Sequence, residues 1–81
     1  MLSPETFENA LASYETGVQR IEQDSLSMGV TYLDRSIPVF QEHGDLRRLT
    51  HARHYKLFAY LRDERYEEVE SLYAQVLQGY V

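Results

Sequence analysis

The 81-residue sequence contains no cysteine and no tryptophan, only two prolines and four glycines, and no long apolar run. Without cysteine, no disulfide can stabilise the fold, which suits a reducing compartment. No apolar stretch approaches the ~20 residues of a membrane span, and the first residues lack the basic and apolar regions of a secretory signal. We therefore expect a cytoplasmic protein that forms one small domain, residues 1–81, with a modest core.

Positive charge is scarce outside one segment. Residues 1–45 carry eight acidic residues against two arginines, whereas residues 46–66 carry five arginines and one lysine against two acidic residues. Residues 67–81 add three glutamates. The net charge of −5 argues against bulk, sequence-independent binding of nucleic acid, although the basic segment keeps a local version of that function open.

Strand-like alternation is also missing, and apolar residues recur instead at steps of three and four, which is typical of helices. Ser3 is expected to cap the first helix, and Pro4 fits its first turn. Gly44 is expected to end the second helix in the left-handed conformation, and Asp45 to cap the third. The apolar stripes are Phe7, Leu11, Tyr14, Val18 and Ile21; Leu26, Val30, Leu33, Ile37 and Phe40; Leu46, Leu49, Leu57, Tyr60 and Leu61; and Tyr66, Val69, Tyr73, Val76 and Tyr80.

The spacing predicts helices that begin near residues 3, 24, 46 and 65. Gly17 lies off its stripe and is expected to weaken the first helix slightly, and Pro38 to kink or fray the second. Short connections require antiparallel neighbours. We therefore predict an all-α fold of two stacked antiparallel helical hairpins, at about residues 3–43 and 45–80.

The two hairpins are related in sequence. An offset of 40 residues places Leu26 on Tyr66, and residue 33 on Tyr73. In residues 32–45 and 65–77 the chain resembles the tetratricopeptide repeat (TPR) family, in its longer bacterial variety. The resemblance implies close helix approach at Gly29 and Ser36, and first helices that line a concave face. The chain departs from the family pattern by large residues at 69 and 76, and by a glutamate at 64 where a turn glycine is usual.

The resemblance implies a non-catalytic protein–protein interaction module, an adaptor or scaffold in assembly or regulation. Two hairpins are fewer than the roughly three that a solenoid needs, and ten of the 81 residues are tyrosine or phenylalanine. We therefore expect a homodimer, in which a second copy covers the aromatic surface. The alternative is that a different protein covers this surface. The sequence contains no nucleophile motif and no phosphate-binding loop, so we expect no enzyme, no catalytic residues and no cofactor.

One arc of the third helix interleaves cations with aromatic rings, a mixture suited to an acidic, partly apolar peptide. The alternatives are a solvated face, with its phenylalanine packed on a neighbouring helix, or a nucleic-acid surface on which Tyr55 stacks against a base. A metal site at His51 and His54, joined by His43, would lack a fourth ligand and has no cysteine to help. The predicted partner-binding residues are Arg47, Arg48, His51, His54, Tyr55, Phe58 and Arg62.

Arg53 is unusual because it falls inside the apolar arc of the third helix. We expect a structural ion pair with Glu8 or Glu15, with a place at the partner surface as the alternative.

Overall fold

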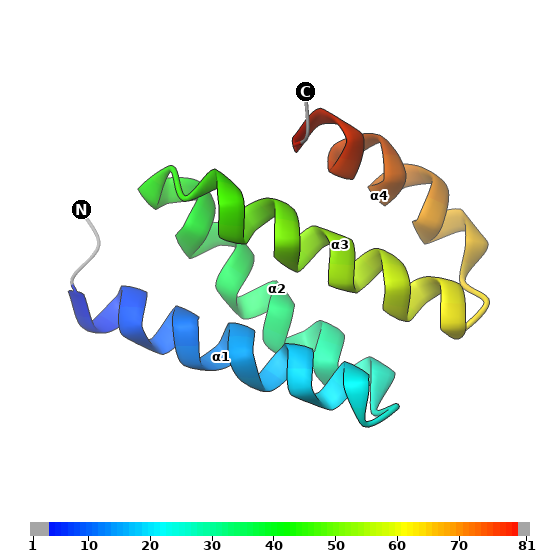
Figure 1. The fold of residues 1–81 in the computed structure, drawn as a ribbon, viewed down its shortest axis with the longest axis horizontal. Helices are drawn as coiled ribbons and strands as arrows, with labels where there is room; N and C mark the ends of the chain where they lie inside the picture. The colour runs from blue at the N-terminus through cyan, green and yellow to red at the C-terminus, as the bar shows by residue number, and fades with distance from the viewer. Residues whose placement is uncertain (1–3, 80–81) are drawn as a thin grey trace.

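The computed structural model describes residues 4–79, and four α-helices follow one another along this part of the chain (Figure 1). Successive helices run in opposite directions and pack in sequence order, and α1 also touches α3. The described residues contain no strand, so the predicted all-α fold of two stacked hairpins is confirmed. The helices are α1 (Pro4–Glu22), α2 (Leu26–His43), α3 (Leu46–Arg62) and α4 (Tyr66–Gly79).

The 40-residue offset seen in the sequence is also a structural period. Helices α1 and α3 end at Glu22 and Arg62, and helices α2 and α4 begin at Leu26 and Tyr66. Each of these two pairs of helix ends is separated by 40 residues. The turn inside each hairpin therefore occupies the same place in the 40-residue period.

The turns inside the two hairpins repeat as well. Asp24 and Glu64 occupy the left-handed region, with φ of 68° and 58°. In each turn the next backbone N–H, of Ser25 or Arg65, donates to the carbonyl five residues earlier, at 2.8 and 2.9 Å. Glu64 thus takes the conformation that glycine adopts most easily, although a side chain costs free energy there.

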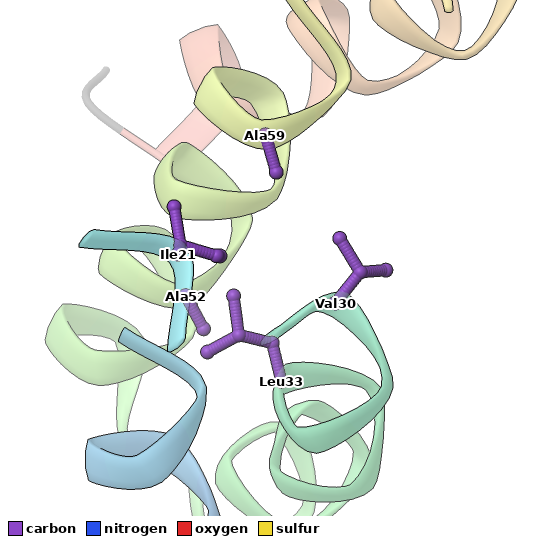
Figure 2. Packing of buried hydrophobic residues seen from close by; sticks show 5 residues of the cluster. All are labelled: Ile21, Val30, Leu33, Ala52 and Ala59. Carbon is purple, nitrogen blue, oxygen red and sulfur yellow. The ribbon is translucent and has the colours of Figure 1, made fainter. Parts of the chain in front are cut away.

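The main core lies where the second hairpin packs on the first. Ile21 from α1 and Val30 and Leu33 from α2 surround two small residues of α3, Ala52 and Ala59 (Figure 2). All five are buried, and Leu33 and Ala52 are fully inaccessible to solvent. The alanines present no bulk to the first hairpin, so α3 can approach it closely.

A second cluster joins the same three helices around Phe40. This ring is fully buried and packs with Ala10 and Leu49. The rings of Phe7 and Tyr14 meet it edge-on, with centroids 6.0 and 5.6 Å away. The apolar stripes predicted for the first two helices therefore face the core.

The stripes predicted for the third and fourth helices were partly wrong. Leu46 and Leu61 are 67% and 47% exposed, and Tyr66 and Tyr73 are 61% and 53% exposed. Among the described residues α4 packs against α3 alone, so one side of the second hairpin has no neighbour. Leu46 is the first residue of α3 and lies at the helix end. Ser3, Tyr80 and the side chain of Val76 lie outside the described residues.

Glycine determines how closely α1 and α2 cross. The predicted close approach at Gly29 is confirmed, because a Cβ atom there would collide with Cγ1 of Ile21. Ser36 is fully buried, and its hydroxyl donates within α2 to the Leu33 carbonyl at 2.8 Å. The prediction for Gly17 was incomplete, since this residue also lies in the crossing. A Cβ atom at Gly17 would lie 2.9 Å from the carbonyl oxygen of Gly29. Because Gly17 has no side chain, the backbones of α1 and α2 can approach each other closely at this point.

The end of α2 and the start of α3 follow the predicted signals. Gly44 is left-handed, with φ of 69°, and the Asp45 carboxylate accepts from the Arg48 backbone N–H at 3.3 Å. The predicted early fraying at Pro38 does not occur, because α2 continues to His43. Pro38 is exposed, so its ring meets solvent rather than a packed neighbour.

We predict that removing the Asp45 cap of α3 lowers the free energy of unfolding by an amount that depends on pH. Burial raises the pKa of the Asp45 carboxyl, but hydrogen bonds from the Arg48 side chain and backbone outweigh burial and lower its pKa overall. A folded pKa below the unfolded value of about 3.9 means that the carboxylate stabilises the fold above that pH and less below it. Asp45→Ala should therefore cost about 1 kcal/mol at pH 7, and the cost should shrink near pH 3. Urea unfolding at both pH values measures this.

Asp45→Asn is the matched control, because asparagine caps helices about as well but does not titrate. A cost of Asp45→Ala that is as large at pH 3 as at pH 7 would contradict a role for the ionised carboxylate.

Candidate partner-binding surfaces

The seven residues predicted to bind a partner all lie on α3, and we call them the α3 arc. Six are exposed and Tyr55 is half-buried. The structure places the arc along the seam between α3 and the first hairpin. There, Tyr55 approaches Glu22 at 3.5 Å, and His51 is hydrogen-bonded to Tyr14 of α1. The structure therefore brings the predicted residues together on one solvent-facing strip.

Much of the charge on the α3 arc already has an intramolecular partner. The guanidinium of Arg48 lies 2.7 Å from the carboxylate of its own helix cap, Asp45. The guanidinium of Arg62 lies 2.7 Å from Asp24 in the turn of the first hairpin, and stands over the ring of Phe58. A ligand at these positions would have to compete with groups of the same chain.

An ion pair away from the arc also joins the two hairpins. Lys56 of α3 lies 2.7 Å from Asp34 of α2, and its side chain is only 18% exposed. The separation of charge along the sequence thus has a structural use, because basic α3 faces acidic residues of the first hairpin. Arg53 is half-buried, but among the described residues neither Glu8 nor Glu15 pairs with it. The acidic residues that pair with α3 come instead from α2 and the adjoining turn.

His51 contacts two tyrosines at the seam, Tyr14 of α1 and Tyr55 of α3. Its ring meets Tyr55 edge-on, with centroids 5.0 Å apart. Burial, followed by the nearby Tyr55 hydroxyl, raises the pKa of Tyr14, and the charges of Arg48 and Arg47 oppose this rise. Tyr14 therefore stays neutral through the physiological range and holds His51 by a hydrogen bond.

The candidate histidines do not form a metal site within the described residues. No group of three His, Asp or Glu converges in this part of the chain. His43 instead packs against Phe7, with ring centroids 4.7 Å apart. The hollow lined by Leu26 and Tyr60 is shallow and open and has no enclosed space for a water molecule, so it is not a ligand pocket. Within residues 4–79, no helix has the length and apolarity needed to cross a bilayer.

A second surface lies on the uncovered side of the second hairpin. It combines Phe58 of the α3 arc with residues that the sequence had assigned to the core, Leu61, Tyr66 and Tyr73 among them. It consists of large apolar side chains from α3 and α4 that are 42–61% exposed. We call it the end face. Its members are Phe58, Leu61, Tyr66, Tyr73 and Leu77.

Each end-face residue lies 40 positions after a residue that belongs to the main core or packs against it. Ile21 and Leu33 are fully buried in that core, whereas their counterparts Leu61 and Tyr73 are about half exposed. The other three counterparts, Val18, Leu26 and Ile37, pack against the same cluster. The end face therefore repeats much of the surface on which α3 sits in the first hairpin, with exposed Glu70 in the position of buried Val30.

A scan against protein-family models and searches of curated proteins and solved structures found no match. The likeness to tetratricopeptide repeats accordingly remains a prediction from the sequence. The helical hairpins and their 40-residue period are observed in the structure.

Proposed function

We propose that this protein is a non-catalytic protein–protein interaction module, a small TPR-like adaptor or assembly factor. The observation that carries the proposal is the end face. Large exposed apolar patches on small proteins usually mark interaction sites, and here the patch reproduces a surface that is buried elsewhere in the same chain. The exposed face of the second hairpin therefore has the apolar character of a surface that packs against another helix.

The α3 arc supports a second, weaker role for the same module. Arg47 and Phe58 remain exposed on it, and a cation beside an aromatic ring can anchor an acidic peptide. The intramolecular contacts of Arg48 and Arg62 leave fewer groups to grip such a peptide. The end face is therefore the primary docking surface in this proposal, and the arc lies at its margin through Phe58.

Site-specific photocrosslinking in cells tests the proposed module. A benzoylphenylalanine in place of Tyr73 puts the reactive group on the end face, and the same residue in place of exposed Ala12 on α1 is the control. We expect covalent adducts with protein from position 73 and not from position 12. Equal adducts from both positions, or no adduct from position 73, would contradict the proposal.

A further inference from the structure

We propose that the occupant of the end face is a second copy of this chain, docked face to face about a two-fold axis. This inference rests on the proposed function and names the partner for its primary surface. Three features of the structure lead to it: the repeat, the composition of the opposite side of the molecule, and the charges of α3 and α4.

The first hairpin shows what the end face requires. Val30 and Leu33 of α2 are covered by α3, which contributes the small residues Ala52 and Ala59 (Figure 2). The residue 40 positions after Leu33, Tyr73, has no such cover among the described residues. A helix that packs here would remove from water the apolar area that α3 removes from the first hairpin, and this burial drives association.

Head-to-tail stacking of copies does not supply that helix. In such a stack α1 of the next copy would take the place of α3, so its outward side would face the end face. That side is polar. The α1 residues 40 positions before Leu49 and Ala59 of α3 are Asn9 and Gln19, and both are exposed. Burying such groups without hydrogen-bond partners costs free energy. The outward side of α1 has the polar character of a capping repeat.

The remaining arrangement joins two end faces, which is the self-complementary geometry of a two-fold dimer. It closes the assembly at two copies, and each copy keeps its polar α1 side toward solvent. The five end-face side chains of one copy would pack against the same five side chains of the other copy. A single interface would therefore cover the end face of both copies.

Charge complementarity also favours a second copy. Three of the five basic residues of α3 already pair with carboxylates of their own chain, and Arg47 remains exposed. On α4, which has no lysine or arginine, Glu67 and Glu70 are exposed. A two-fold axis that lays α3 of each copy along α4 of the other sets opposite charges together twice. Glu70, which holds the position equivalent to buried Val30, would then lie beside basic α3 of the other copy. Such complementarity selects the partner as well as adding attraction.

Sedimentation equilibrium over a micromolar concentration series tests the dimer. The unmodified chain should reach twice its mass of 9.5 kDa and dissociate on dilution. The double variant Tyr73→Lys, Leu77→Lys should stay at the mass of one chain, because both lysines would be buried against basic α3. The matched double variant Ala12→Lys, Gln19→Lys, on the outward side of α1, should behave like the unmodified chain.

All four positions are exposed, so circular dichroism should report unchanged helicity in both variants. An unmodified chain that stays monomeric overturns the inference, and so does a dimer that survives the end-face lysines or is lost with the α1 lysines. Crosslinks from position 73 only to another protein would overturn the second copy and keep the interaction module. No crosslink from that position would overturn both.

Discussion

Phe40→Ala is expected to lower the free energy of unfolding by about 3–5 kcal/mol, the usual cost of emptying a buried phenylalanine site. The Phe40 ring is fully buried and joins three helices, through Ala10 of α1 and Leu49 of α3. Removing it leaves a cavity and also removes two edge-on contacts with aromatic rings of α1. For a domain of this size the loss is a large part of the roughly 4–12 kcal/mol that holds it folded.

Thermal and urea unfolding followed by circular dichroism measure this loss. The midpoint temperature should fall by more than about 12 °C, taking roughly 4 °C for each kcal/mol. Met28→Ala is the control, because Met28 lies on the same helix and is 51% exposed. It should change stability by less than about 0.5 kcal/mol. Equal costs for the two variants would mean that the aromatic cluster does not hold the first hairpin to α3.

Gly29→Val is expected to destabilise the fold by about 3 kcal/mol, the upper part of the usual cost of overpacking. Valine is the residue that the second hairpin carries at the equivalent position, 69. A Cβ atom at Gly29 would collide with Cγ1 of Ile21 and lie 2.9 Å from the carbonyl oxygen of Gly17. The carbonyl belongs to helix backbone and the Ile21 side chain is fully buried, so neither can move aside at low cost.

The matched control for this variant is Ser27→Val, which places the same side chain on an exposed position of α2. It tests the helix propensity of valine without the crossing, and should cost less than about 1 kcal/mol. Urea unfolding of both variants measures the difference. A Gly29→Val protein as stable as Ser27→Val would show that α1 and α2 do not need the close crossing.

The fold could be predicted from the sequence because each of its determinants is local. Apolar spacing gave the four helices, and Gly44 followed by Asp45 marked the boundary between the hairpins. The role of Gly17 could not be predicted from one helix, because its close contact is with Gly29 of the next. Pro38 was expected to kink or fray the second helix, but α2 continues through it to His43, at the loss of the backbone hydrogen bond that proline cannot donate.

The docking surface was predicted less well than the fold. An apolar stripe shows which residues favour burial. It does not show whether the residues that bury them belong to the same chain or to a partner. Leu61 and Tyr73 were assigned to the core for this reason, and they lie on the end face. The signal that distinguishes them was already in the sequence. At an offset of 40 residues they match Ile21 and Leu33, which α3 covers, and no described helix takes that place on the second hairpin.

The central claim is that the end face of the second hairpin is a docking surface for a second copy. Nuclear magnetic resonance of methyl-labelled protein, recorded across a dilution series, tests it most directly. The methyl signals of Leu61 and Leu77 should shift with protein concentration, while that of Ala12 on the outward side of α1 should stay fixed. Signals that are all independent of concentration, or a shift confined to Ala12, would contradict the claim.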